Sequence, residues 1–249
     1  MGFLYGARAP TGAIEGDLMM DRSEFDKFAE EYKAQLDSSL GASGEDAEYF
    51  AEYKVKDVVS VARQHGLQPA RVLDFGCGIG GATPYFHAYL PATELVGVDV
   101  SIKSLEIARS RFGKLATYLE FDGLTLPFPD GTFDIVFAAC VFHHIPEAAH
   151  VRLLTEIRRV LSQQGRFIVF EHNPLNPLTR RVVDKCPFDE NAVLMRSGQL
   201  RRRLESAGLR AVQTRYRIFF PHALRKLRGL ESALTWCPLG AQYFLCASK

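Results

Sequence analysis

The sequence predicts an α/β fold in which helices cover both faces of a mainly parallel, seven-stranded sheet. Two patterns indicate this fold. From residue 71 onward, short apolar segments alternate with segments of helical length, which is typical of repeated β-α-β units. A glycine-rich loop at residues 76–81 follows the first apolar segment, where such folds bind ligands. The chain has 249 residues, 47% of them hydrophobic, which is enough for the core of one such domain.

Seven apolar segments are expected to form the strands. Helix-length connections separate the first five, so these strands should be parallel. The last two should form an antiparallel hairpin, because Pro221, Pro238 and Gly240 displace the helix between them. The seven segments are residues 71–75, 94–99, 117–121, 133–138, 167–170, 211–218 and 243–247.

The clearest helix signal covers residues 147–161. Pro146 suits the first turn of a helix, and Glu147 suits its positively polarised start. Arg158 and Arg159 suit its negatively polarised end. The face expected to be buried consists of Val151, Leu154, Ile157 and Leu161.

Two further helices are expected before the first strand. At residues 21–40, aromatic and aliphatic side chains recur every three or four positions, and Tyr32 is one of them. The second helix is expected at residues 45–65, and Gly66 ends it. We expect residues 1–66 to form a helical cap, from which Tyr32 contacts a bound substrate.

The charge is balanced overall but unevenly distributed. The net charge is +1, so the composition implies no general attraction to nucleic acid. Residues 1–57 hold thirteen acidic side chains and six Lys or Arg, whereas residues 196–228 hold ten Lys or Arg and one acid, Glu205. Either these regions are two solvated faces of opposite sign, or the basic region borders a pocket and favours an anionic ligand.

The cysteines and the hydropathy indicate in which cellular compartment the protein is expected. The five cysteines form no C-x-x-C pair, which indicates a reducing compartment and a cytoplasmic protein. No signal peptide is recognisable, and no uncharged apolar stretch reaches the roughly 18 residues of a spanning helix. We therefore expect no stable membrane insertion. The cysteines are Cys77, Cys140, Cys186, Cys237 and Cys246.

Three glycines at the end of the first expected strand indicate a ligand-binding loop. Gly76, Gly78 and Gly81 satisfy the pattern G-x-G-x-x-G. Without a Cβ, the backbone can approach a ligand closely, and amides at the following helix start can bind it. By itself, the pattern also fits an NAD-dependent oxidoreductase or a tight turn without a ligand.

Acidic side chains at three strand ends narrow the choice of ligand. Asp74 would repel a pyrophosphate but attract an ammonium group. Asp99 can accept hydrogen bonds from both hydroxyls of a ribose, although it could instead cap a helix, a role that Ser101 fills better. Asp122, followed by Gly123, can accept from the amino group of adenine or simply form a turn.

Four motifs in this order resemble the class I S-adenosylmethionine-dependent methyltransferases. They are residues 72–81, residues 97–99, Asp122 with residues 126–134, and residues 143–147. The resemblance covers about residues 70–171 and is strongest to the small-molecule branch that includes enzymes of ubiquinone and menaquinone biosynthesis. It implies a Rossmann-like sheet with an antiparallel last strand, and S-adenosylmethionine at the carboxyl ends of strands one to three.

The resemblance also implies which residues bind this cofactor. The methionine part would lie against Asp74 and the glycine loop, the ribose against Asp99, and the adenine against Asp122. The expected cofactor contacts are Asp74, Gly76, Cys77, Gly78, Asp99, Val100, Asp122, Gly123 and Cys140.

Polar side chains follow the fourth and fifth strands, where an acceptor would lie. His143 and His144 are the expected catalytic residues, because removing a proton from a hydroxyl acceptor requires a base within hydrogen-bond reach. Alternatively, they pack against the next helix and catalysis proceeds by alignment alone. Glu171 and His172 are expected to contact the substrate. No metal is expected, because residues 138–140 offer no carboxylate.

The sequence thus predicts a methyltransferase acting on a small metabolite, a glycosyl compound or a lipid-like molecule, with O-methylation favoured over C- or N-methylation. Residues 67–249 would form the methyltransferase domain, in which residues 174–196 and 219–238 wall the acceptor pocket. A nucleic-acid substrate is disfavoured, because residues 139–142 lack an Asn-Pro-Pro-Tyr motif. The remaining alternatives are the oxidoreductase and a non-catalytic cofactor-binding module.

Overall fold

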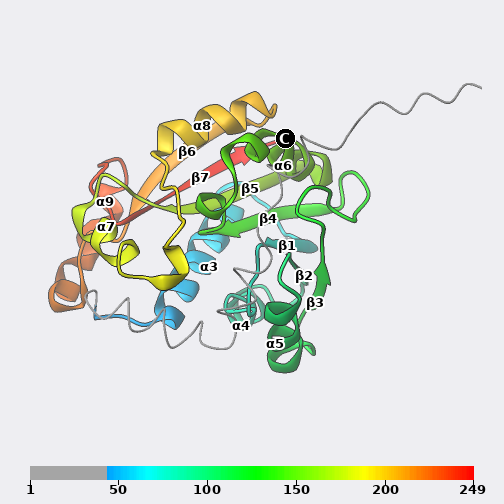
Figure 1. The fold of residues 1–249 in the computed structure, drawn as a ribbon, viewed down its shortest axis with the longest axis horizontal. Helices are drawn as coiled ribbons and strands as arrows, with labels where there is room; N and C mark the ends of the chain where they lie inside the picture. The colour runs from blue at the N-terminus through cyan, green and yellow to red at the C-terminus, as the bar shows by residue number, and fades with distance from the viewer. Residues whose placement is uncertain (1–43) are drawn as a thin grey trace, which may run out of the picture.

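The computed structural model describes residues 44–249, and Figure 1 shows their fold. The helix expected at residues 21–40, with Tyr32, lies outside the described residues. The second expected helix is present as α3 (Ala47–Gln64). It begins at Ala47 rather than at Glu45 because Asp46 caps it, with a side-chain oxygen that accepts a hydrogen bond of 2.8 Å from the Tyr49 amide.

Within residues 44–249, seven strands form one sheet in the order β3-β2-β1-β4-β5-β7-β6. β7 runs antiparallel to both of its neighbours, and every other pair of adjacent strands is parallel. This confirms the expected Rossmann-like topology. The strands are β1 (Arg71–Phe75), β2 (Glu94–Asp99), β3 (Thr117–Glu120), β4 (Phe133–Ala139), β5 (Leu161–His172), β6 (Arg210–Arg217) and β7 (Gln242–Ser248).

The strand order determines where a ligand can bind. β1 lies next to both β2 and β4, and the strand order reverses between β1 and β4. In sheets of this type a crevice opens outside the carboxyl ends of the strands at such a reversal. The glycine loop follows β1 and the two histidines follow β4, so both lie at this edge.

Helices cover both faces of the sheet (Figure 1). α3 packs against α4 (Thr83–Tyr89) on one face, and α6 (Glu147–Val160) packs against α8 (Ser197–Ser206) on the other. None of the helices in the described part of the chain is long and apolar enough to cross a membrane. The remaining helical elements are α5 (Ile102–Phe112), η1 (Phe142–His144), α7 (Pro177–Val183), η2 (Pro187–Asp189), η3 (His222–Leu230) and α9 (Glu231–Leu234).

Side chains of β1 alternate between the two apolar layers, as strand geometry requires. Val72 joins the cluster beneath α3 and α4, whereas Leu73 and Phe75 join the cluster beneath α6 and α8. All three are fully buried. The carboxyl end of β1 is therefore held rigidly between two packed layers, and the loop that follows starts from a fixed point.

Helix α6 confirms the strongest helix signal but corrects its buried face. Leu154 and Ile157 are buried as expected, whereas Val151 is 40% exposed and Leu161 begins β5. At about 100° per residue, Val151 points away from the face that Leu154 shares with its neighbours. That face also includes Ala149, His150, Leu153 and Val160.

The acidic and basic regions of the sequence contact each other. Arg217 on β6 donates hydrogen bonds of 2.7 and 2.8 Å to the two carboxylate oxygens of Asp57 on α3. Arg228 donates a hydrogen bond of 2.7 Å to Glu45, just before the same helix. These arginines therefore hold the α3 region against the C-terminal part of the chain.

Candidate active site

The loop after β1 is held by main-chain hydrogen bonds to β2. The amides of Gly76 and Cys77 both donate to the carbonyl oxygen of Val98, at 2.9 and 3.0 Å. Gly76 and Gly78 have φ angles of 72° and 51°, in the left-handed region that favours glycine. A Cβ on Gly76 would lie 2.5 Å from a methyl carbon of Val141, so this glycine allows two strand ends to approach each other.

Gly78 has a different environment from Gly76. A Cβ on Gly78 would meet no atom within 4 Å, because this glycine borders a pocket of about 490 Å³. The pocket lies between the glycine loop and α3, and Lys54 on α3 and Asp74 on β1 both line it. Exposed main chain beside a buried acid is a donor and acceptor set that fits the amino-acid end of S-adenosylmethionine.

Asp74 is buried at this pocket, with 4% of its surface exposed. Burial and then the nearby carboxylate of Asp99 raise the pKa of Asp74 to about 7, although Lys54 opposes this rise. A cationic ligand stabilises the ionised form of such a carboxyl group. Asp74 is therefore suited to an ammonium group, and its contact with the cofactor stays a prediction.

Asp99 at the end of β2 accepts main-chain hydrogen bonds with both of its carboxylate oxygens. Its Oδ2 accepts a hydrogen bond of 2.8 Å from the Gly78 amide, and its Oδ1 accepts one of 2.9 Å from the Ser101 amide. Ser101 itself caps α5, because its hydroxyl accepts from the Ser104 amide at 3.1 Å. Asp99 thus joins the glycine loop to β2. Its role toward a ribose stays a prediction, which the geometry permits because each carboxylate oxygen can accept more than one hydrogen bond.

The expected adenine contacts lie after β3. Asp122 is exposed, and its Oδ1 accepts hydrogen bonds from the amides of Leu124 and Thr125, at 2.8 and 2.7 Å. These bonds form the turn that was the alternative reading of this residue. Gly123 has a φ of 83°, and a Cβ there would lie 3.5 Å from a methyl carbon of the buried Val100. Val100 and Gly123 are thus adjacent, and their contact with adenine stays a prediction.

The two cysteines assigned to the cofactor differ in environment. Cys77 is buried, and this burial raises the pKa of its thiol. Cys140 follows β4 with a φ of 59°, which is strained for a residue with a side chain. Its Sγ lies 3.5 Å from Lys54 Nζ. Burial opposes ionisation of this thiol, but His172 and Lys54 outweigh burial and lower the pKa of Cys140 to about 7.

Glu171 organises the segment that follows β4. Only 1% of its surface is exposed, and its Oε1 accepts hydrogen bonds from the amides of Val141 and Phe142, at 3.2 and 2.8 Å. Its Oε2 lies 2.5 Å from His143 Nδ1. Burial acts to raise the pKa of the Glu171 carboxyl, but the charge on His143 outweighs it and lowers that pKa. Glu171 therefore positions η1 and His143 from inside the protein.

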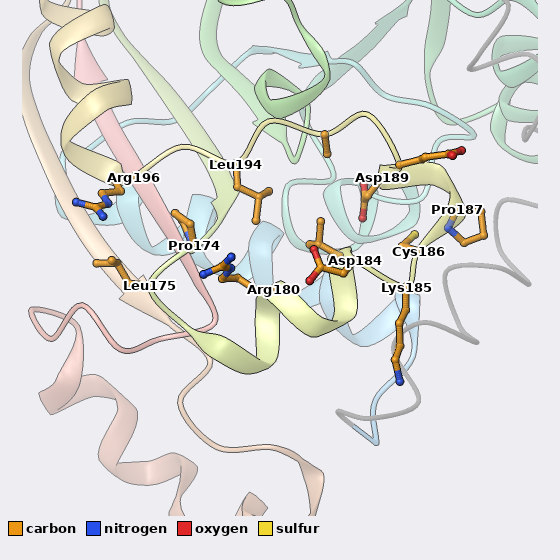
Figure 2. Close-up of a pocket in the computed structure, with 13 residues that line it drawn as sticks. Pro174, Leu175, Arg180, Asp184, Lys185, Cys186, Pro187, Asp189, Leu194 and Arg196 are labelled. Atoms are coloured by element: carbon orange, nitrogen blue, oxygen red, sulfur yellow. The ribbon is translucent and has the colours of Figure 1, made fainter.

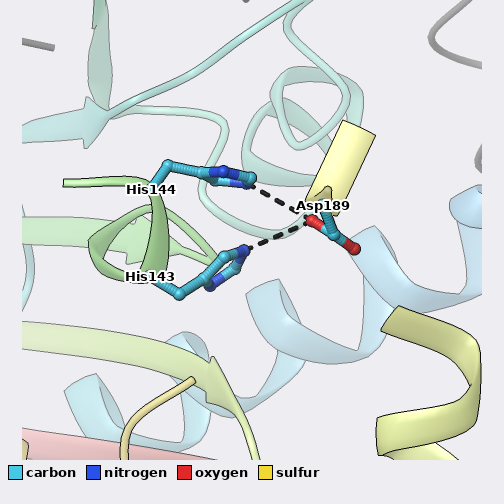
Figure 3. A group of neighbouring side chains, drawn as sticks. All are labelled: His143, His144 and Asp189. Carbon is cyan, nitrogen blue, oxygen red and sulfur yellow. Dashed lines mark ion pairs between the residues drawn. The ribbon is translucent and has the colours of Figure 1, made fainter. Parts of the chain in front are cut away.

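His143 and His144 face a carboxylate that the sequence analysis did not single out (Figure 3). Oδ1 of Asp189 lies 3.5 Å from His143 Nε2 and 3.4 Å from His144 Nε2. Burial opposes a charge on His143, but Glu171 and Asp189 outweigh it and raise the pKa of His143 to about 10. Burial lowers the pKa of His144. The pKa values of these two adjacent imidazoles are therefore shifted in opposite directions.

A second pocket, of about 770 Å³, lies beside this cluster (Figure 2). It is lined by residues between 174 and 196, and Asp189 belongs to both the pocket and the cluster. The Val193 amide donates a hydrogen bond of 2.8 Å to the carbonyl oxygen of His143, which joins this wall to the histidines. The charged side chains of the wall have both signs: Arg180, Asp184, Lys185, Asp189, Glu190 and Arg196.

Sequence reasoning missed Lys54 and Asp189. Lys54 resembles any other lysine of an amphipathic helix, and only its burial beside Asp74 and Cys140 distinguishes it. Asp189 lies in a segment without periodicity, far from the histidines in sequence. The one available signal was the expectation that residues 174–196 form a pocket wall. Tyr32 lies outside the described residues, so its expected substrate contact stays a prediction.

Comparisons with known proteins show that the chain is similar to methyltransferases. Residues 73–169 match the family model described as a methyltransferase domain. A demethylmenaquinone methyltransferase of Thermotoga maritima is 33% identical over 161 residues, which are 65% of this chain and 64% of that protein. A fatty-acid O-methyltransferase of Mycolicibacterium smegmatis is 30% identical over 145 residues, which are 57% of this chain and 52% of that protein.

A solved structure shows the same fold. It is a S-adenosylmethionine-dependent methyltransferase of Thermotoga maritima, described as a possible histamine N-methyltransferase. It superposes with a TM-score of 0.65 at 20% identity, over 91% of this chain and 99% of that one. In sequence, the chain spans 49% to 64% of the length of three demethylmenaquinone methyltransferases that it matches. The family match and the superposition agree: residues 73–169 are similar to methyltransferase domains, and the chain shares the fold of a S-adenosylmethionine-dependent methyltransferase.

Proposed function

We propose that this protein transfers a methyl group from S-adenosylmethionine to a hydroxyl oxygen of a small acceptor molecule. The observation that carries the proposal is the buried cluster of His143, His144 and Asp189 at the carboxyl edge of the sheet. Methyl transfer to a hydroxyl requires removal of its proton, and imidazole and carboxylate groups promote this step. The cluster follows Val141, which lies close to Gly76 of the glycine loop, and this proximity supports a meeting of cofactor and acceptor here.

On the cofactor side, the residues of this chain would bind S-adenosylmethionine and orient its methyl group. S-adenosylmethionine supplies an electrophilic methyl group on a sulfonium when it is bound. We assign Asp74 to its amino group, Asp99 to its ribose, and Asp122 to its adenine. Burial of Asp74 and the open space at Gly78 support this assignment. Further contacts are assigned to Gly76, Cys77, Gly78, Val100, Gly123 and Cys140.

On the acceptor side, we propose that residues 174–196 wall the acceptor pocket, with residues 219–238 and the cap of residues 1–66 completing it. The volume of about 770 Å³ supports a metabolite, glycosyl compound or lipid-like molecule. The fatty-acid O-methyltransferase that this chain resembles supports transfer to oxygen, and the demethylmenaquinone methyltransferases support a lipid-like acceptor. C- or N-methylation of a small molecule is the alternative.

Fewer arginines are available to bind an anionic acceptor than the sequence suggested. Arg217 and Arg215 donate hydrogen bonds to Asp57 and Gln64 of α3, so these arginines are used within the protein. Arg180 and Arg196 line the second pocket and could bind an acidic group. We therefore assign any recognition of a negative charge to these two residues.

We assign His144, whose pKa is lowered by burial, to proton removal from the acceptor hydroxyl, and His143 to a hydrogen bond that holds this hydroxyl in place. Glu171 is the residue that positions His143. His172 lies beside them, with a ring centroid 5.2 Å from that of His143, and we assign it to substrate contact. Replacement of His144 or His143 by Gln should lower turnover about a hundredfold or more, while S-adenosylhomocysteine binding is unchanged. The control is His87→Gln, on exposed α4 surface. Near-normal turnover in both cluster variants would mean that alignment alone drives the reaction.

The proposal is tested by a panel of hydroxyl, amine and carbon acceptors, with release of S-adenosylhomocysteine as the readout. We expect release with a hydroxyl acceptor and an O-methyl product by mass spectrometry. Release only with amine or carbon acceptors would overturn O-methylation. Calorimetric binding of NAD in place of S-adenosylhomocysteine would overturn the cofactor assignment.

A further inference from the structure

We propose that His143, His144 and Asp189 bind a divalent transition-metal ion. The ligand atoms would be the two Nε2 nitrogens and a carboxylate oxygen of Asp189, which all lie within 4.8 Å of one another (Figure 3). This inference rests on the proposed function and changes how the hydroxyl is activated: with both Nε2 atoms as ligands, the metal would lower the pKa of the acceptor hydroxyl, whose proton would leave to water. The binding of the metal itself does not depend on that function.

The spacing of these atoms matches a shared ion better than direct hydrogen bonds. Oδ1 of Asp189 lies 3.5 Å from His143 Nε2 and 3.4 Å from His144 Nε2. Hydrogen bonds between nitrogen and oxygen usually measure about 2.7–3.2 Å. Two ligand atoms that each lie about 2.1 Å from a tetrahedral metal are separated by about 3.4 Å. The two nitrogen–oxygen separations are therefore compatible with ligand atoms that share an ion.

A buried carboxylate fixes the direction of one ligand. Glu171 Oε2 lies 2.5 Å from His143 Nδ1, which leaves Nε2 of the same ring directed at Asp189. Metal-binding histidines commonly donate their other ring N–H to a carboxylate, which fixes the tautomer and increases the basicity of the ligand nitrogen. Glu171 is itself held by two main-chain amides, so the arrangement is built into the fold.

Burial and local charge also favour a cation here. The side chains of His143, His144 and Asp189 expose 1%, 6% and 10% of their surface. The carboxylates of Glu171 and Asp189 lie on either side of the His143 ring and make the potential between the imidazoles negative. A divalent cation bound to Nε2 of His143 would replace the proton on that nitrogen and compensate for the same buried charges.

The ligand set indicates the class of metal. Two imidazole nitrogens and one carboxylate oxygen suit Zn²⁺, Co²⁺, Fe²⁺ or Mn²⁺, whereas Mg²⁺ and Ca²⁺ prefer sites built from oxygen alone. Three protein ligands also leave a coordination position for an outside molecule. Asp189 lines the second pocket (Figure 2), so an acceptor oxygen could fill this position from that side.

This inference departs from the sequence-based expectation that no metal binds. That expectation considered only residues 138–140 at the end of β4, where no carboxylate occurs. The carboxylate is supplied instead by η2, which the bond from Val193 to His143 holds against the histidines.

The test uses the full chain, first treated with a chelator and then titrated with Co²⁺, whose visible absorption reports its ligands. We expect one Co²⁺ per chain, displaced by Zn²⁺. Asp189→Asn and His144→Gln should abolish the spectrum, and Glu171→Gln should weaken binding about tenfold to a hundredfold. Asp184→Asn, in the same pocket wall, is the matched control and should bind Co²⁺ normally. Circular dichroism confirms that each variant is folded.

The result that would overturn the inference is wild-type protein that binds no Co²⁺, or folded Asp189→Asn and His144→Gln variants that bind it normally. The inference and the proposed function can fail separately. Methyl transfer that persists in chelator, without Co²⁺ binding, overturns only the metal. One Co²⁺ per chain without S-adenosylhomocysteine release from any acceptor overturns only the proposed reaction.

Discussion

The loop after β1 and the segment after β4 meet at one edge of the sheet, but they are held in different ways. The loop is held by main chain, because the Val98 carbonyl oxygen accepts from the amides of Gly76 and Cys77. The segment after β4 is held by one buried side chain, Glu171, which binds two amides and His143. The proposed cofactor side thus depends on backbone conformation, whereas the proposed acceptor side depends on individual side chains.

Because the two regions are held differently, substitutions in them should change different properties of the protein. On the cofactor side, a side chain that faces the pocket can be changed while the main chain keeps the loop in place. On the acceptor side, removal of Glu171 leaves buried amides and an imidazole without their acceptor, which is costly. Substitutions on the first side should therefore affect mainly ligand affinity, and substitutions of Glu171 should affect mainly stability and the position of His143.

The largest effect is expected for Glu171→Ala. Loss of one partner of a buried charged pair costs about 3–5 kcal/mol of unfolding free energy. Urea denaturation measures this change, and exposed Glu190→Ala in the second pocket wall should stay within about 0.5 kcal/mol of wild type. A Glu171→Ala loss of less than about 1 kcal/mol would show that the main chain also supports this side.

An intermediate effect is expected for Asp99→Ala. Loss of a charged acceptor for two ribose hydroxyls costs about 1.5–3 kcal/mol, or roughly a tenfold to hundredfold weaker binding of S-adenosylhomocysteine. Isothermal titration measures the affinity. Asp122→Ala is the comparison, and it should weaken binding less because that side chain is exposed. If Asp99→Ala binds normally and is folded, its carboxylate serves only the amides of Gly78 and Ser101.

The smallest effect is expected for the pH dependence of cofactor binding at Asp74. Burial and the Asp99 carboxylate raise the pKa of Asp74 to about 7, and Lys54 opposes this rise. The folded protein then binds more protons than the unfolded chain between about pH 4 and pH 7, so Asp74 lowers stability as pH rises through this range. A bound ammonium favours the ionised form, so S-adenosylhomocysteine affinity should rise up to about tenfold between pH 6 and pH 8. Titration calorimetry measures this affinity at each pH, and the affinity of the Asp74→Asn variant should not change with pH. A flat wild-type profile would contradict the pairing.

Strands and loops that depend on residues close together in the sequence could be predicted from the sequence. The alternation of apolar segments located all seven strands, and β1 and β2 have the predicted ends. The glycines of the loop could be recognised because a left-handed backbone at Gly76 and Gly78 is a local requirement. The β-α-β pattern was enough to predict parallel strands, since parallel neighbours need crossover connections. The order β3-β2-β1-β4-β5-β7-β6 was not predicted from it.

Only the tertiary structure decided which side chains meet. Asp189 and Lys54 reach the site from segments far from the strand ends, and their distance from His144 or Cys140 is not encoded in any spacing along the chain. The buried role of Glu171 also required the fold, because a carboxylate after a strand can face solvent, substrate or protein. The sequence by itself determined the sheet and the cofactor loop, which rest on local backbone preferences and hydrophobic periodicity. The acceptor side was decided by packing between distant segments, because hydrogen bonds, pKa shifts and metal ligation depend on separations of a few ångströms.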